Sequence, residues 1–182
     1  EPRLTGAIMP INNFILATES LGEERARNLI RNDVAVSDTK FVVDYFRMSP
    51  DHRLLFGGGE NYTRRFPTDI KSFVRRYMLR VFPQLSKVCV DYAWGGTLAI
   101  TRSRLPLFGR FDGDTYYALG YSGQGVALAT LAGQVLSDAI AGTVEDFDVF
   151  ARLPRRQFPG GALLRWPSLA FGMMYYALRD QL

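Results

Sequence analysis

Residues 114–133 constrain the fold most, because they place a strand, a glycine turn and a helix within one short stretch. The apolar and aromatic run at 116–119 is typical of a buried strand. A glycine-rich turn at 120–125 follows, with Ser122 as the expected N-cap of a helix. A helix leaves its first N–H groups unpaired, and its dipole favours negative charge at that end. The stretch therefore predicts a helix N-terminus suited to an anion or to a partial negative charge.

The spacing of these glycines differs from that of a dinucleotide-binding loop. Residues 120–125 read G-x-x-G-x-G, whereas the dinucleotide fingerprint is G-x-G-x-x-G. In a Rossmann unit, an acidic residue also ends a second strand about 20 positions further on. The acidic residues at 145–148 directly follow a helix instead. Pyrophosphate binding is not predicted here, and a plain strand-turn-helix packing element remains an alternative to a ligand site.

The helix after the turn is apolar on most sides, which predicts burial nearly all round. Gly125, Ala129 and Gly133 lie four residues apart and form a stripe of small residues. This stripe favours tight packing of the helix on a sheet, with a dimer contact as the alternative. Gly142 is expected to end the helix.

The composition is that of a globular protein. The chain has 182 residues, 47% of them hydrophobic, which suffices for one large or two small domains. With a single Cys89 and a single His52, an internal disulfide is excluded and a metal cluster is not expected. Cys89 lies in a strand-like run and is interpreted as a buried, inert thiol. This cysteine usage favours a cytoplasmic protein.

Neither nucleic acid nor a membrane is an expected partner. The net charge is only +4, and the arginines are scattered along the chain rather than gathered on one predicted face. The start of the chain lacks the pattern of a signal peptide. Residues 161–182 are apolar but interrupted by arginines and Pro167, so they are too short and too charged to span a bilayer. A docking helix that starts near Pro167 is predicted, with an interfacial membrane anchor as the minor alternative.

The remaining segments alternate between strands and helices. Residues 41–47 and 53–57 predict a hairpin whose turn is formed by 49–52. Residues 69–81 have apolar positions at helical spacing, and Pro83 is expected to end that helix. A further strand is predicted at 88–95. Strands joined by hairpins, with helices inserted, indicate an α+β fold with a mainly antiparallel sheet and flanking helices.

Several motifs occur in an order that resembles the carboxyl-terminal part of the D-amino-acid oxidase-like (DAO) family of FAD-dependent oxidoreductases. The resemblance extends over essentially the whole chain, and within the family it is greatest to members that oxidise gamma-glutamylputrescine. The segments that carry it are residues 9–19, 53–60, Trp94-Gly-Gly-Thr97, Thr101–Gly109, Tyr116–Gly125, Leu131-Ala-Gly133 and 158–161.

This resemblance implies that the chain is a fragment. Family members open with a Rossmann unit whose G-x-G-x-x-G binds the FAD pyrophosphate, and no segment here matches it. The missing N-terminal FAD-binding half is therefore an expected partner, and FAD binding by this chain alone is not expected. The resemblance divides the chain into a substrate-domain sheet and helix (1–113), a strand-turn-helix that contacts FAD (114–142) and a docking tail (143–182).

In such proteins the glycine motif before the last helix lies against the pyrimidine edge of the isoalloxazine ring. Reduction places negative charge at the N1–C2=O locus of the flavin, which N–H groups and a helix dipole stabilise. No catalytic residue is predicted. The cofactor-binding residues that the resemblance implies are Gly95, Gly96, Thr97, Gly120, Tyr121, Ser122, Gly123, Gln124, Gly125 and Val126.

Three departures from the family pattern bear on the substrate and the electron acceptor. Leu98 stands where amino-acid-oxidising relatives often have a carboxylate-binding arginine, which disfavours a simple α-amino acid. Gln124 replaces a histidine that is frequent in the turn. Leu55 aligns with a lysine that assists the reaction with oxygen in some sarcosine-oxidising relatives, so the acceptor stays open.

Two residues are candidates for substrate binding. Tyr45 and Arg47 are expected on opposite faces of their strand, and Tyr45 is the candidate, with a core tyrosine as the alternative. Arg102, beside Arg104, is a candidate for an acidic substrate tail such as a gamma-glutamyl carboxylate, with a solvated surface pair as the alternative.

The expected function is oxidation of the C–N bond of a small-molecule amine to an imine that water hydrolyses. Two other classes stay open, a non-catalytic binding or assembly module and a membrane-associated dehydrogenase.

Overall fold

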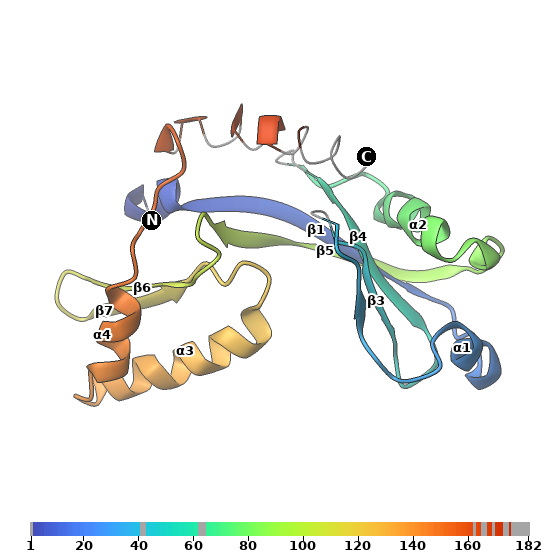
Figure 1. The fold of residues 1–182 in the computed structure, drawn as a ribbon, viewed down its shortest axis with the longest axis horizontal. Helices are drawn as coiled ribbons and strands as arrows, with labels where there is room; N and C mark the ends of the chain where they lie inside the picture. Colours follow the sequence, from blue (N-terminus) through green and yellow to red (C-terminus); the bar gives the residue numbers. More distant parts are fainter. Residues whose placement is uncertain are drawn as a thin grey trace. The chain divides into compact units, whose positions relative to one another are not determined.

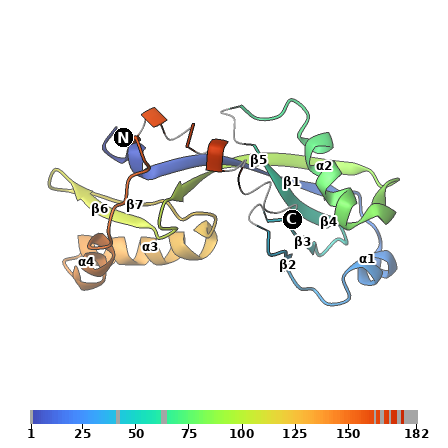
Figure 2. The same ribbon diagram turned by 45° about the horizontal axis from the view of Figure 1, so that its top comes forward.

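A computed structural model describes residues 2–40, 43–61, 65–161, 163–164, 167–168, 170–172 and 175. The chain divides into two compact units. The first comprises Glu1–Ile11 and Leu98–Phe171, and the second comprises Asn12–Thr97 and Gly172–Leu182. Most of the predicted docking helix near Pro167 lies outside the described residues. Figure 1 and Figure 2 show the elements along the chain.

The second unit is built on a sheet with the strand order β2-β3-β4-β1-β5. Its helices are α1, Glu23–Leu29, and α2, Ile70–Val81, and the short 3-10 helix η2, Pro83–Leu85, follows α2. The strand pairs β1–β4, β2–β3 and β3–β4 are all antiparallel, which confirms the predicted fold class. The strand bounds are β1, Ile8–Thr18; β2, Val36–Ser37; β3, Tyr45–Met48; β4, Leu54–Asn61; and β5, Val90–Thr101.

The predicted hairpin forms, and its turn is held by side chains. The Ser49 N–H donates to the Arg53 carbonyl at 2.9 Å, and Ser49 Oγ accepts from the Arg53 N–H at 3.0 Å. The register places Tyr45 opposite Gly57. The hairpin therefore fixes which side chains of β3 and β4 face one another.

Helix α2 begins and ends where the sequence predicts. Asp69 caps it by accepting a hydrogen bond from the Ser72 N–H at 3.0 Å, and the helix stops at Phe82, before Pro83. Hydrogen bonds from the Ser72 hydroxyl and backbone hold the pKa of Asp69 below its usual range.

Strand alternation gives the sheet one buried, apolar face. Phe14, Leu16, Leu54 and Phe56 are fully buried on this face. Helices α1 and α2 cover it in Figure 1, and Ala26, Val74 and Met78 are their contributions to the core. The opposite face of the sheet forms the wall of an apolar pocket.

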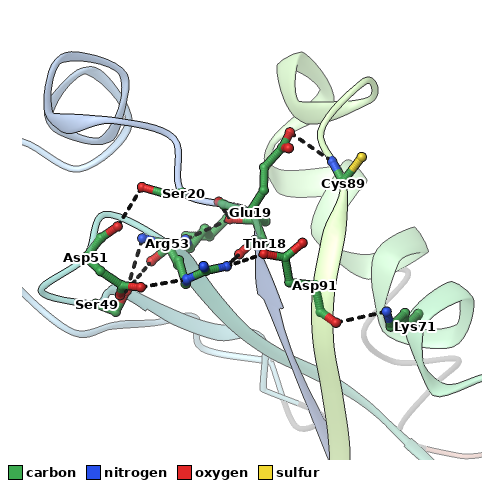
Figure 3. Close-up of polar contacts among 10 residues, drawn as sticks. Thr18, Glu19, Ser20, Ser49, Asp51, Arg53, Lys71, Cys89 and Asp91 are labelled. Atoms are coloured by element: carbon green, nitrogen blue, oxygen red, sulfur yellow. Dashed lines mark hydrogen bonds and ion pairs between the residues drawn. The ribbon is translucent and has the colours of Figure 1, made fainter.

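A polar cluster joins β1, β4 and β5 at one end of this sheet (Figure 3). The Arg53 guanidinium pairs with Asp51 and Asp91 and donates to the Thr18 carbonyl at 2.8 Å. Both ion pairs, that with Asp91 first, raise the pKa of Arg53. Cys89 lies beside this cluster and is exposed, so the prediction of a buried thiol was wrong. The reason is that β5 begins only at Val90, which leaves Cys89 before the strand, where its N–H donates to Glu19.

The first unit packs two helices against a two-stranded sheet. It contains η1, Pro2–Ala7; β6, Leu107–Phe111; β7, Thr115–Leu119; α3, Gly125–Ile140; and α4, Glu145–Ala151. Strands β6 and β7 are antiparallel. One buried hydrophobic cluster of this unit consists of Phe108, Ala132, Val135, Ala139 and Phe147.

The expectation that α3 is buried nearly all round was wrong. Only Ala132, Val135 and Ala139 of this helix are buried, whereas Val126 is 95% exposed and Ile140 is 70% exposed. Within its unit, α3 packs through one face only, because β6, β7 and α4 all lie on that side (Figure 1, Figure 2). The small-residue stripe is not a tight contact either, since a Cβ at Gly133 meets nothing within 4 Å. Gly142, with φ of 104°, follows the helix end as predicted.

The described residues also bear on membranes and metals. Within the described ranges, no helix combines the length and the apolar character that crossing a membrane requires. No three or more His, Cys, Asp or Glu side chains in those same ranges are grouped so as to hold a metal ion.

Candidate functional site

The glycine turn of the first unit connects β7 to α3 through left-handed backbone. Gly120, Ser122 and Gly123 have φ values of 76°, 52° and 95°. A Cβ at Gly120 would lie 2.5 Å from Thr101 Cγ2, so a side chain has no room there. Glycine is therefore required at 120 both by backbone conformation and by close packing.

Ser122 is not the N-cap of α3, which corrects the sequence prediction. The N-cap is Gln124, without a side-chain hydrogen bond. Ser122 Oγ instead donates to the Gly120 carbonyl at 3.1 Å and accepts from the Thr101 N–H at 3.2 Å, and the Ser122 N–H donates to the Ala99 carbonyl at 3.2 Å. Ser122 points back to β5 because its left-handed backbone turns the side chain away from the helix. Its role is to fix the turn.

The start of α3 offers N–H groups to a ligand. The Leu128 N–H donates to the Gln124 carbonyl at 3.1 Å, and helix geometry leaves the N–H groups of Gly125, Val126 and Ala127 without an intrahelical acceptor. A Cβ at Gly123 would meet nothing within 4 Å, so the turn is open on that side. A ligand group with negative or partial negative charge fits this end, because bare backbone permits close approach.

Tyr121 contributes an aromatic side chain beside the turn. Its hydroxyl donates to the Ala118 carbonyl at 3.1 Å, and burial raises its pKa. The phenol is therefore a neutral, structurally engaged group at ordinary pH.

The other predicted cofactor residues belong to β5 in the second unit. A Cβ at Gly95 would lie 2.5 Å from the Phe14 ring, so core packing alone explains this glycine. Gly96 has open space in place of a side chain, which suits close approach of a ligand to the backbone. Thr97 Oγ1 donates to Asn12 Oδ1 at 2.8 Å. The sequence prediction of one cofactor set thus corresponds to residues in two units.

The second unit contains a largely apolar pocket of about 280 Å³ on the sheet face opposite α1 and α2. This volume lies near the lower end of the range for small-molecule sites, about 300–1,000 Å³. All five strands of the sheet, β1 to β5, contribute to it. Its lining residues are Ile15, Ala35, Val36, Ser37, Tyr45, Phe46, Arg47, Leu55, Gly57 and Trp94.

Tyr45 and Arg47 both line this pocket, so the expectation that they point to opposite faces was wrong. Side chains alternate with a period of two, and residues two apart therefore share a face. The period of two therefore identifies Arg47 as a pocket residue once Tyr45 is one. Leu55 and Gly57 on β4 are also two residues apart and share the pocket face. Trp94 could not be assigned to this face from the sequence, because the predicted strand ended one residue after it.

Tyr45 crosses the sheet to reach β1. Its hydroxyl donates to Asn13 Oδ1 at 2.6 Å. A Cβ at Gly57 would lie only 2.1 Å from the ring carbon Cζ of Tyr45, so the ring occupies the space of a side chain at residue 57. Gly57 therefore lets the ring lie flat over β4. The satisfied hydroxyl agrees with the alternative interpretation of Tyr45, but the half-buried ring still forms part of the pocket wall.

Arg102 lies in the first unit and does not line the pocket. Its Nη1 donates to the Gln157 carbonyl at 3.5 Å, and the side chain is exposed, as is that of Arg104. Arg102 is thus a surface residue of a loop, and its predicted role with a substrate carboxylate stays a prediction.

The described residues thus combine an apolar pocket on an antiparallel sheet with an open glycine turn before a helix. The family model "FAD dependent oxidoreductase" (DAO) matches residues 1–139, and the chain belongs to this family.

Two relatives agree with this assignment. The chain is 45% identical over 182 residues to gamma-glutamylputrescine oxidoreductase of Escherichia coli K12, covering all of this chain and 43% of that protein. It is 38% identical over 174 residues to the probable oxidoreductase OrdL of Haemophilus influenzae, covering 96% of this chain and 39% of that protein. The chain therefore spans about two fifths of the length of these relatives.

The fold also matches crystal structures of more distant proteins. Glycine oxidase from Geobacillus kaustophilus has a TM-score of 0.63 at 16% identity, over 84% of this chain and 40% of that one. L-proline dehydrogenase from P. horikoshii has a TM-score of 0.58 at 21% identity, over 82% of this chain and 38% of that one. At these identities the likeness shows the fold.

Proposed function

We propose that the chain forms the substrate-binding part of an FAD-dependent amine oxidoreductase that acts on gamma-glutamylputrescine or a close analogue. The observation that carries this proposal is the 45% identity to the E. coli enzyme over the entire chain. In the reaction, the carbon beside the terminal nitrogen loses a hydride equivalent and the nitrogen loses a proton, so that a C=N bond forms. Water then adds to the imine and releases ammonia, which leaves an aldehyde.

The turn at 120–125 and Val126 are proposed to hold the edge of the flavin. FAD, when bound, supplies the acceptor for the hydride equivalent. The open N–H groups at the start of α3 and the helix dipole stabilise negative charge that develops beside them. Gly123 leaves the backbone uncovered for this contact. The exposed backbone at Gly96 is a second proposed contact, whereas Gly95 is explained by packing.

The pocket of the second unit is proposed to receive the substrate. Ile15, Leu55 and Trp94 present apolar surface suited to a hydrocarbon chain, and the Tyr45 ring adds a rigid wall. These groups bind and orient the amine and keep water from most of its length. No acid or base in this lining is assigned a proton transfer.

A nucleotide-binding half, carrying the FAD pyrophosphate site, is the proposed partner. Two observations support it. The chain corresponds to 43% of the E. coli relative, and α3 leaves Val126 and Ile140 exposed on the side away from its buried residues. Apolar side chains gathered on one helix face favour a protein contact.

The proposal is tested by joining the chain to the part of the E. coli relative that it does not match, and assaying FAD content and aldehyde formation from gamma-glutamylputrescine. We expect this fused enzyme to retain FAD and form the aldehyde, and the chain alone to bind little FAD. A fused enzyme that folds but holds no FAD would favour a non-catalytic binding or assembly module.

A matched pair of variants tests the turn separately. Gly123→Leu should reduce the FAD content of the fused enzyme, because the side chain would cover the open N–H groups. Gly142→Leu adds the same side chain at another open position with positive φ, just after α3, and should leave FAD content unchanged because it lies far from the turn along the helix. Equal FAD content in both variants would remove the turn from the cofactor site.

A further inference from the structure

The pocket of the second unit has one charged residue among its described lining, Arg47. The other polar side chains there are Ser37 and Tyr45, and the Tyr45 hydroxyl already donates to Asn13. No carboxylate in this lining neutralises the guanidinium. The pocket therefore combines an apolar wall with a positive charge, which suits a molecule with a hydrocarbon body and an anionic end.

The Arg47 guanidinium retains most of its hydrogen-bonding capacity. Its Nε donates to the Met48 carbonyl at 3.3 Å, and among the described residues neither terminal nitrogen has an acceptor. Arg53, on the neighbouring strand, is the opposite case, because Asp51 and Asp91 both hold its guanidinium. An arginine with two uncommitted terminal nitrogens can bind a carboxylate through two parallel hydrogen bonds.

We infer that Arg47 is the specificity-determining residue that binds the carboxylate of the amine substrate. This inference rests on the proposed function, since gamma-glutamylputrescine carries an α-carboxylate at the end remote from its terminal amine. With the carboxylate on Arg47, the hydrocarbon chain contacts Ile15, Leu55 and Trp94. Repulsion between cations directs the terminal amine away from the guanidinium. Arg47 takes the role for which the sequence suggested Arg102, which lies outside the pocket.

A pair of ligands isolates the carboxylate. Gamma-glutamylputrescine and 4-aminobutanoylputrescine differ only in that group, because the second compound is the decarboxylated form of the first. Binding of each to the 182-residue chain is measured by calorimetry, with tryptophan fluorescence as a second readout. Arg47→Gln removes the charge, Arg47→Lys keeps it without the planar fork, and Arg27→Gln removes an exposed arginine of α1 as the control. Circular dichroism verifies that each variant is folded.

We expect the wild-type chain to bind gamma-glutamylputrescine about 10- to 100-fold more tightly than its decarboxylated analogue, as a charged hydrogen-bonded pair would give. Arg47→Gln should remove this preference and leave binding of the analogue within about twofold, Arg47→Lys should keep part of it, and Arg27→Gln should keep all of it. Equal affinities in the wild type, or an equal loss for both ligands in Arg47→Gln, would overturn the inference.

The same two amines, assayed as substrates of the fused enzyme, distinguish this inference from the proposed function. Oxidation of both at equal kcat/KM would overturn the role of Arg47 and leave the function intact. Arg47-dependent binding to the chain without oxidation by a folded, FAD-loaded fused enzyme would overturn the function and leave the recognition intact.

Discussion

Single buried polar groups decide how firmly the strands of the second unit are joined. Thr18 is fully buried at the end of β1, where its Oγ1 accepts from the Leu54 N–H at 3.0 Å and donates to the Glu19 carbonyl at 2.8 Å. The hydroxyl thus replaces a missing strand-to-strand hydrogen bond at the start of β4. A side chain of the same shape without the hydroxyl would leave that N–H unsatisfied.

Thr18→Val should therefore lower the free energy of unfolding by about 1–3 kcal/mol, the cost of a buried donor without a partner. Urea denaturation of the chain measures this change. Thr130→Val is the control, because Thr130 is exposed on α3 and its hydroxyl bonds only to its own helix. A loss for Thr18→Val no larger than that of the control would contradict the account.

The N-cap of α2 gives a prediction that depends on pH. The folded-state pKa of Asp69 is depressed by its hydrogen bonds to Ser72, so the ionised cap stabilises the fold above the unfolded pKa of about 3.9. That stability is lost as the pH falls through the folded pKa. Asp69→Ala should accordingly be less stable than the wild type at pH 7, with a difference that shrinks in acid.

Denaturation curves at several pH values below 5 follow this difference. Asp69→Asn, which keeps a capping oxygen without the charge, should retain part of the stability and lose its pH dependence at this site. A difference in the free energy of unfolding between the wild type and Asp69→Ala that stays constant as the pH falls would contradict the role of the ionised Asp69 cap.

The helices and strands that could be predicted are those whose bounds depend on residues close to one another in the sequence. The hairpin turn at 49–52 and helix α2 were predicted because Asp69, Pro83 and the turn residues act on their own neighbours. Strand β5 runs past Gly95 and Gly96 to Thr101, although glycines normally favour a strand end. There, pairing with the neighbouring strand β1 outweighs the low strand propensity of glycine. A local sequence pattern contains no information about that pairing.

The candidate site shows the same limit. The glycine turn could be located from the sequence, but the role of Ser122 could not, because its partners Thr101 and Ala99 are distant in the chain. Likewise, the apolar composition of α3 predicts that the helix has packing partners. It does not indicate whether those partners belong to this chain. The shared face of Tyr45 and Arg47, by contrast, follows from strand alternation alone.

The open surface at Gly133 allows a test of the exposed face of α3. A Cβ there meets nothing within 4 Å, and alanine is a better helix former than glycine. Gly133→Ala should thus raise the free energy of unfolding of the chain alone by about 0.5–1 kcal/mol, as read from urea denaturation. Gly142→Ala is the contrasting variant and should destabilise, because residue 142 has φ of 104°. A destabilised Gly133→Ala chain would show that this face is packed within the chain after all.

For the molecule as a whole, the two units supply complementary parts of one proposed chemistry. The first contributes open N–H groups at a helix start, and the second contributes an apolar pocket with a cation. The proposed function assigns both to the oxidation of an amine by FAD, and the proposed nucleotide-binding half would cover the exposed face of α3.

The central claim is that this chain presents an amine to FAD for oxidation, and anaerobic reduction of the flavin tests it most directly. The fused enzyme is mixed with gamma-glutamylputrescine without oxygen or any other acceptor, and the visible absorbance of the oxidised flavin is followed. The account predicts that the absorbance is lost upon addition of the amine, more slowly with 4-aminobutanoylputrescine at the same subsaturating concentration. An FAD-loaded, folded enzyme whose absorbance persists with both amines would contradict it.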